Sequence, residues 1–437
     1  METNNLIGES AVPKSARRGR VRPTGDSPRL GALEILKYIG PGFLVTIGFI
    51  DPGNWASNLA AGSSFGYSLI WVVTLGTLML MLLQHNAAHL GIATGYCLSE
   101  ASTIFLPRAL SVPILGSAVA AAISTALAEV LGMAIAINMI TGLALKFAVV
   151  LACALAMLML FTNSYRRLEK WIIGFVSIIG IAFVAELAMV KVDWAGAATG
   201  AFVPSMPRLS LVIVLSLLGS VVMPHNLFLH SEIIQSRQWN LEDGCAIRHQ
   251  LRFEFLDTMI SMVVGWAINC AIIILAAATF HVRGLRVEQL GDAKRLLEPL
   301  LGKASGIIFA VALLFSGFSS SMTAGMAGGA IFTGIFGECF DIEDRHTRWG
   351  IIITLVGAAA IALAVRDPFW ALVLSQMALS VQLPFTIFTQ IALTSSRKVM
   401  GEFANRRLTN ALLLACGIAV SALNIALVVA FIQSPGQ

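Results

Sequence analysis

The chain has 437 residues, of which 57% are hydrophobic and only 12% are charged, and its mean hydropathy is +0.82. Soluble domains are roughly a quarter charged, so this composition excludes an ordinary soluble protein. The net charge of +5 does not indicate nucleic-acid binding, because the basic residues gather between apolar segments. Six scattered cysteines without a Cys-x-x-Cys pair predict free thiols rather than disulfides or a zinc site.

The first residues of the chain, 1–34, are polar and rich in arginine, which predicts a disordered cytoplasmic tail rather than a secretory signal. A membrane-spanning helix takes about 20 mostly apolar residues. By this measure residues 35–431 form a single transmembrane domain, and the chain is an all-α membrane protein. Its eleven candidate spans lie at about 39–62, 66–91, 112–141, 143–162, 171–190, 208–235, 254–281, 303–334, 349–365, 369–394 and 408–431.

Lysine and arginine are unevenly distributed between the two sides of these spans. On the side of the N-terminus lie 20 of the 29 basic residues, and cytoplasmic loops are the ones that carry this excess. We therefore predict a multi-pass protein of the plasma or inner membrane, with a cytoplasmic N-terminus and an external C-terminus. The segment 236–252, which mixes charged and large apolar residues, is expected to lie at the cytoplasmic interface.

Two spans are interrupted near their middle, the first by DPGN at 51–54 and the sixth by MPHN at 223–226. Proline removes a backbone donor and glycine loosens the helix, and the freed backbone groups must be satisfied inside the protein. Breaks at matching places five spans apart are typical of an inverted-repeat transporter with its substrate between them. The repeats would cover about 35–190 and 208–394, and a further helix would follow at about 408–431.

The donor atoms at the breaks indicate what is bound. Asp51 supplies an anionic oxygen, Asn54 an amide oxygen, and unwound backbone near Gly48 and Ser220 supplies carbonyls. Met223 adds a thioether, which softer transition metals use but magnesium and calcium do not. A mid-membrane carboxylate costs at least about 2.5 kcal/mol and is a functional hypothesis by default, whereas a lone methionine usually only packs. Together they predict a site for a divalent transition-metal cation.

The stretches around both breaks resemble the Nramp family of divalent metal transporters. GPGFLVTIGFIDPGNWASNLAAGSSFGY is similar to the first helix of that family, and GSVVMPHNLFLHSEI to its sixth. AEVLGMAIAIN resembles the third helix, and LVLSQMALSVQLPF with TSSRKVMGEFAN the tenth helix and the following loop. The resemblance covers about 35–430. It implies a LeuT-like inverted repeat of five plus five helices with one more, and import of manganese or ferrous iron by alternating access, usually with protons.

The resemblance also implies roles for single residues. The metal ligands would be Asp51, Asn54 and Met223, the carbonyls of Gly48 and Ser220, and Gln376 in the occluded state. The proton-linked residues would be His225, His230 and Glu129. Imidazole titrates near neutral pH, which agrees with this role, although simple hydrogen bonding explains the two histidines equally well. The metal is cargo, so neither an enzyme activity nor a resident cofactor is expected, and no obligate protein partner is indicated.

Two departures from the family pattern concern protons. The aspartate that usually precedes the third-helix glutamate by three residues is Ala126, and the usual arginine pair of the ninth helix falls on Glu343 and Asp344. Both positions belong to the network that carries protons inward in the family. The sequence therefore supports metal binding and leaves proton coupling open.

Two alternative functions share the predicted fold. One is an uncoupled or magnesium-preferring transporter, which Met223 opposes, and the other is a sodium-coupled amino-acid or amine transporter. An enzyme is the weakest alternative, because His-Glu-x-x-His, Gly-x-Ser-x-Gly and Walker motifs are absent from the sequence. His85 and His89 have the spacing of a metal site on the second span, but interfacial hydrogen bonding is the commoner explanation for such a pair.

Overall fold

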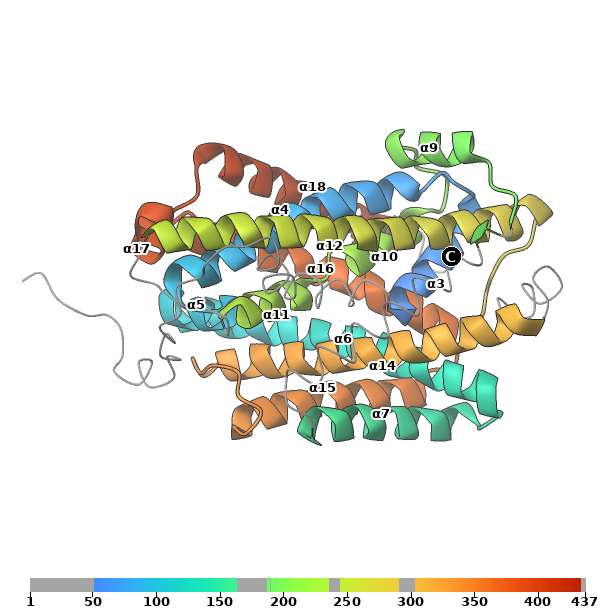
Figure 1. Ribbon diagram of the computed structural model, residues 1–437, viewed down its shortest axis with the longest axis horizontal. Helices are drawn as coiled ribbons and strands as arrows, with labels where there is room; N and C mark the ends of the chain where they lie inside the picture. Colours follow the sequence, from blue (N-terminus) through green and yellow to red (C-terminus); the bar gives the residue numbers. More distant parts are fainter. Residues whose placement is uncertain (1–50, 163–186, 189, 236–243, 291–302, 434–437) are drawn as a thin grey trace, which may run out of the picture.

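The computed structural model describes residues 51–162, 187–188, 190–235, 244–290 and 303–433. These segments form a bundle of long helices that run back and forth along one direction (Figure 1). One end of the bundle carries α5 (Leu98–Phe105), α17 (Arg397–Met400) and η3 (Gly401–Phe403), and we name it the α5 end. The opposite end, with α9 (Trp194–Phe202) and η2 (His281–Arg283), is the α9 end.

The helices of the bundle follow the expected spans in order. They are α3 (Pro52–Phe65), α4 (Ile70–Thr94), α6 (Arg108–Thr141), α7 (Leu145–Thr162), α10 (Leu211–Val221), α11 (Pro224–Gln235), α12 (Gly244–Thr279), α14 (Lys303–Gly334), α15 (Arg345–Ala364), α16 (Pro368–Thr394) and α18 (Arg407–Gln433). In the described part of the chain, nine stretches are long and apolar enough to cross a membrane. The tail at 1–34, the start of the first span and nearly all of the fifth lie outside the described residues.

The segment before the seventh span differs from the prediction. Residues 244–252 were expected in a separate interfacial segment, but they form the first turns of α12. Ile247 is buried in a cluster with Ala88 and Ile92 of α4 and Ile234 of α11. The apolar residues of this segment are thus used for packing against the bundle, which lets the helix continue for 36 residues.

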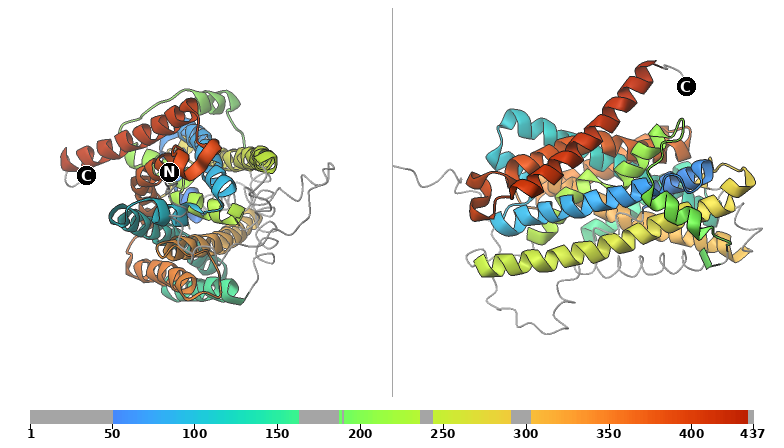
Figure 2. Two further views of the ribbon diagram at one scale, coloured as in Figure 1. Left: turned by 90° about the vertical axis from the view of Figure 1, so that its left-hand side faces the viewer. Right: turned by 90° about the horizontal axis from the view of Figure 1, so that it is seen from above.

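Two layers of helices enclose the centre of the molecule. On one side α6, α7, α14 and α15 pack together, and on the other α4 lies along α12. Between them α3, α10 and α16 are in mutual contact, and α11 packs against α4, α14 and α16. Helix α18 lies at the periphery and crosses the bundle obliquely, as Figure 2 shows. The short helices α3, α10 and α11 therefore lie inside the bundle, between its two layers.

Candidate metal site

The sixth span is broken where α10 ends and α11 begins. Val222 leaves the helical conformation with ψ of 77°, and α11 starts afresh at Pro224. Proline is suited to the first turn of a helix because its missing N–H has no partner there anyway. The last carbonyls of α10 have lost their helical partners, and the negative end of its dipole points into the bundle centre, which favours a cation.

The first span supplies the start of α3 to the same place. Asp51 is fully buried and caps α3, and its Oδ1 accepts a hydrogen bond from the Asn54 backbone N–H at 2.5 Å. Pro52 lies so close to α6 that a Cβ on Gly132 would come within 2.0 Å of its ring. This close approach requires glycine and fixes the carboxylate at the centre of the bundle.

Direct hydrogen bonds connect the start of α3 to the last turns of α10. The Asn54 side-chain amide donates to the backbone carbonyl of Ser220 at 3.0 Å, and it also lies 3.2 Å from Asp51 Oδ2. One turn further along, the hydroxyls of Ser57 and Ser216 are 2.6 Å apart, which ties α3 to α10. The predicted juxtaposition of the two interrupted spans is therefore present, with Asp51, Asn54 and the Ser220 carbonyl in one connected group.

Gln376 of α16 closes the site from a third direction. Its buried side chain packs against the start of α3, where a Cβ on Gly53 would lie 2.1 Å from Nε2. A side chain at position 53 would displace the amide from this place. The side chain is thus placed beside the Asp51–Asn54 group, where the sequence comparison with the family expected it.

Several acceptor atoms at this junction have no hydrogen-bond partner in the described structure. They are Oδ1 of Asn54, Oε1 of Gln376 and Oδ1 of Asn226, and all three are buried. Leaving a buried acceptor unsatisfied costs about 1–3 kcal/mol, so such atoms are uncommon unless something binds them. The Asn54 and Gln376 oxygens lie at the start of α3 beside Asp51, and that of Asn226 lies at the start of α11 beside Met223. Such oxygens suit a cation.

Met223 lies in the break itself and is buried. Its sulfur accepts a hydrogen bond from the Asn226 side-chain amide at 3.2 Å, so the thioether is oriented by a polar neighbour rather than only packed among apolar groups. Asn226 was part of the motif in the sequence but received no role. The hydrogen bond from Asn226 to the Met223 sulfur depends on the conformation in which α11 begins, which the sequence does not show.

Glu129 lies on α6 on the far side of Asp51. Its carboxylate accepts hydrogen bonds from the hydroxyls of Ser320 on α14 and Thr125 on α6, the latter at 3.5 Å. It is buried, and its charge interacts with that of Asp51. Two negative charges at short range in a buried site repel each other, and a bound divalent cation would relieve that repulsion.

The two histidines of α11 have different environments. His225 follows Pro224 and is buried, with Nδ1 lacking a hydrogen-bond partner in the described structure. His230 is two turns from the break and has no exposed surface. Its ring bonds Gln84 of α4 and Glu254 of α12. Sequence reasoning did not single out Glu254, because the residue stands at the start of the predicted span 254–281, where a charged side chain is expected to face the membrane surface.

Two positions that depart from the family pattern, Ala126 and Asp344, do not place an acid next to Glu129. Ala126 is fully buried on α6. Asp344 caps α15 at the α5 end, where its carboxylate accepts the backbone N–H groups of His346 and Thr347. Gly48, the remaining predicted ligand, lies outside the described residues.

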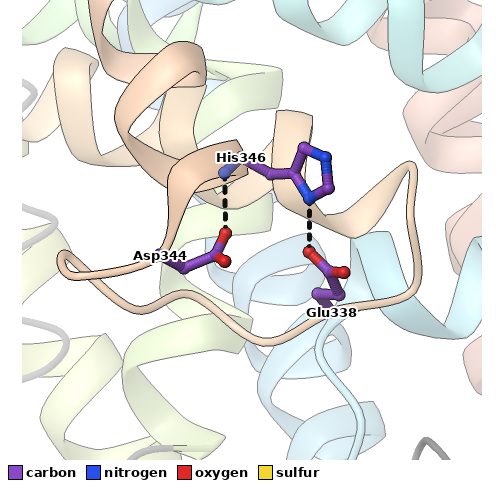
Figure 3. Close-up of side chains that lie close together, drawn as sticks. All are labelled: Glu338, Asp344 and His346. Carbon is purple, nitrogen blue, oxygen red and sulfur yellow. Dashed lines mark hydrogen bonds and ion pairs between the residues drawn. The ribbon is translucent and has the colours of Figure 1, made fainter.

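A second group of ligand-type side chains lies on the loop between α14 and α15 (Figure 3). Among the described residues, Glu338, Asp344 and His346 are the one group of three His, Cys, Asp or Glu side chains whose ligand atoms lie within 4.8 Å of one another. Glu338 is paired with His346 at 2.7 Å, and the His346 ring stacks on Phe336. These contacts explain the group as an exposed ion pair beside a helix cap, and exposed pairs contribute little stability.

Comparison with known proteins identifies relatives along almost the whole chain. A family model described as Natural resistance-associated macrophage protein-like matches residues 42–430. The Divalent metal cation transporter MntH of Ralstonia nicotianae is 39% identical over 407 residues, which cover 90% of this chain and 91% of the relative. The protein of the same name from Caldanaerobacter subterraneus is 36% identical over 377 residues, with 85% and 88% covered.

Solved structures agree with these relatives. The Eremococcus coleocola manganese transporter, solved with an aromatic bis-isothiourea substituted compound, matches with a TM-score of 0.79 at 28% identity and covers 94% of this chain and 90% of its own. Mhp1, a nucleobase-cation-symport-1 family transporter, matches with a TM-score of 0.62 at 15% identity over 89% and 87%, which shows a shared fold alone. The LeuT-like fold is confirmed, and the chain belongs to the Nramp family.

Proposed function

We propose that this chain imports divalent transition-metal ions, manganese or ferrous iron, through the junction of α3 with the α10–α11 break. The observation that carries the proposal is the buried Asp51 carboxylate surrounded by oxygens without hydrogen-bond partners. The names of the relatives, divalent metal cation transporter and manganese transporter, support it. Transport by alternating access is the mode that a fold of broken helices serves.

The proposed ligands come from both sides of the junction. Asp51 provides the charge, Asn54 Oδ1 a neutral oxygen and Met223 the sulfur. The Ser220 carbonyl already accepts a hydrogen bond from the Asn54 amide, so a cation would replace that donor. Two further proposed ligands are Gly48, through its carbonyl, and Gln376, through Oε1.

The direction of transport follows from the orientation that we propose for the bundle. The α5 end carries Arg345, Arg348, Arg397 and Lys398, and the excess of basic residues on the side of the N-terminus is a cytoplasmic feature. The α5 end would thus face the cytoplasm and the α9 end the outside. Lipid of the plasma or inner membrane surrounds the bundle, whose α18, α7 and α15 present many exposed apolar side chains.

Proton movement with the metal is a separate part of the proposal. Glu129, His225 and His230 are buried ionisable side chains around the site, and buried ionisable groups in a membrane protein commonly serve ion or proton pathways. The absence of an acidic residue at Ala126 favours either another proton route or uncoupled transport.

The alternative substrates fit the site less well. Magnesium prefers oxygen ligands with octahedral geometry and gains nothing from a thioether. An amino-acid substrate would bring its carboxylate next to Asp51 and Glu129, two acids that already repel each other. A transition-metal cation uses both the charge and the sulfur.

Uptake by the full chain in proteoliposomes tests this function. We expect manganese uptake that ferrous iron, cobalt and cadmium inhibit at concentrations near that of manganese, while magnesium and calcium inhibit only in large excess. A pH-sensitive dye inside the vesicles records proton movement in the same experiment. Equal inhibition by magnesium, or uptake of amino acids or amines in place of manganese, would contradict the proposal.

A further inference from the structure

Glu254 on α12 lies between two imidazoles from two other helices. Its Oε2 is 2.5 Å from Nδ1 of His85 on α4, and its Oε1 is 3.2 Å from Nε2 of His230 on α11. The Glu254 side chain is 4% exposed and that of His230 has no exposure, whereas the His85 side chain is 30% exposed. The three side chains form a continuous hydrogen-bonded row from the buried centre to the edge of the bundle.

The ionisable groups that face Glu254 from the neighbouring helices are imidazoles. From α4 the ionisable groups that face Glu254 are His85 and His89, and from α11 it is His230. Helix α3, which also packs against α12, contains no charged side chain between Pro52 and Phe65. On α12 itself the Thr258 hydroxyl donates to Glu254 Oε1 at 2.7 Å. Asp257, one turn along α12, is a second buried acid. The groups bonded to the Glu254 carboxylate are two imidazoles and a hydroxyl, all of which exchange protons.

At the inner end of the row, the side-chain oxygen of Gln84 is free to accept a hydrogen bond from His230. Gln84 Nε2 lies 3.3 Å from His230 Nδ1, so the amide donates and His230 Nε2–H donates to Glu254. Gln84 Oε1 is buried and has no hydrogen-bond partner in the described structure. Rotation of the amide gives Nδ1–H an acceptor, and His230 is then stable with both nitrogens protonated.

The outer end of the row continues toward the α5 end of the bundle. The rings of His85 and His89 are stacked, with their centroids 6.4 Å apart, and they lie one helical turn apart on α4. The His89 side chain is hydrogen-bonded to Asn405. Asn405 lies in the connection between η3 and α18, at the α5 end, so the row leads to the proposed cytoplasmic face.

We propose that His230, Glu254 and His85 form a proton relay that carries protons from the metal site to the cytoplasmic side. The relay rests on the metal-transport function proposed above. A proton binds His230 at Nδ1, and Nε2 transfers its own proton to Oε1 of the Glu254 carboxylate. The carboxyl group rotates, since its terminal torsion is broad, and gives that proton to Nδ1 of His85 in the tautomer that carries its hydrogen on Nε2. His85 then releases the Nε2 proton toward the α5 end, and both imidazoles return to their starting tautomers. One proton enters at His230 and one leaves from His85, and Glu254 returns to the carboxylate.

The start of the relay is near the site without belonging to it. Seven residues separate Met223 from His230, which is about 10 Å along a helix. On α6 the residue one turn before Glu129 is Ala126 rather than a further acid. This helix therefore offers no second carboxylate at that position to accept a proton from Glu129. The row through α11, α12 and α4 provides the acceptors that this side lacks.

The ratio of protons to manganese taken up by proteoliposomes of the full chain tests the relay. Glu254→Gln keeps the shape and hydrogen bonding of the side chain but binds no proton, and His85→Gln interrupts the row at its exposed end. We expect each substitution to slow manganese uptake and to lower the proton-to-manganese ratio at least about tenfold, since positioned proton transfer contributes at least that much. Glu338→Gln is the matched control, because this exposed glutamate also pairs with an imidazole, and it leaves the ratio unchanged.

Each other outcome has a distinct meaning. If Glu254→Gln and His85→Gln slow manganese and protons in the same proportion, the three residues only position helices and the relay is wrong. If the unsubstituted protein takes up manganese without protons, the relay is also wrong while metal transport stands. If the unsubstituted protein takes up no manganese, the proposed function itself fails. The exposed His85 provides the test even where a change at buried Glu254 impairs folding.

Discussion

Two places in the described part of the chain gather side chains of the types that ligate metals, and they differ in almost every respect. The group of Glu338, Asp344 and His346 has three ionisable ligands close together, but it is exposed and its atoms are engaged in an ion pair and a helix cap. The junction of Asp51 with Met223 has one carboxylate, neutral oxygens and a sulfur, and it is buried with acceptors unsatisfied. The surface group is therefore distinguished by charged side chains that lie close together, whereas the buried site is distinguished by oxygen atoms that lack hydrogen-bond donors.

The difference follows from what each place requires. A transport site must bind a cation and also release it, so a single charge with neutral oxygens and a soft sulfur is adequate, and discrimination comes from the sulfur. An exposed loop can hold several charges at little cost because water solvates them. The predictions below test this contrast by changing one charge, one sulfur and one exposed imidazole.

The largest effect is expected for Asp51→Asn. Asparagine still caps a helix, so α3 is retained while the only negative ligand is lost. Outer-shell metal partners are worth about 10- to 100-fold in affinity, and we expect loss of a direct anionic ligand to lower manganese uptake by more than about 100-fold. Asp367→Asn, at the exposed cap of α16, is the control and should transport normally. Normal uptake by Asp51→Asn would mean that the cation binds elsewhere.

A smaller and more selective effect is expected for Met223→Leu. Leucine has nearly the volume of methionine but no sulfur, so folding is preserved and only the soft ligand is removed. We expect the preference for manganese over calcium and magnesium to fall about tenfold, which corresponds to about 1.4 kcal/mol. Competition uptake measures it, with Met326→Leu, a buried methionine of α14, as control. Unchanged selectivity would show that Met223 only packs.

The smallest effect is expected for His346→Ala on the α14–α15 loop. The substitution removes an exposed ion pair with Glu338 and a ring contact with Phe336, which together are worth about 1 kcal/mol or less. Thermal unfolding in detergent should shift by at most a few degrees, and manganese uptake should not change. A large loss of uptake would give this loop a part in transport and would overturn the contrast with the buried site.

Much of the fold could be predicted from the sequence because lipid imposes simple rules. Each apolar run of sufficient length within the described residues became a helix, the interruption at 223–226 coincided with the break between α10 and α11, and α3 begins within the interruption at 51–54. The grouping of Asp51 with Asn54 also followed from local sequence, since both stand at one helix start. Gln376 was expected only through the family resemblance, because its approach to Gly53 depends on how α16 crosses α3.

What the sequence did not reveal are contacts between helices far apart in the chain. Glu254 is the first residue of the predicted span 254–281, and only the packing of α12 against α4 brings it to His85. Asn226 likewise gained a role only when the start of α11 placed its amide on the Met223 sulfur. Periodicity and motifs describe single helices, and such pairs depend on rotation of one helix relative to another.

The most direct test of the central claim is a diffraction experiment on manganese-soaked crystals with anomalous data collected at the manganese edge. We expect the strongest interior peak between Asp51, Asn54 and Met223, and we expect it to disappear in Asp51→Asn crystals treated in the same way. A peak only at Glu338, Asp344 and His346, or an interior peak that persists in Asp51→Asn, would contradict the account.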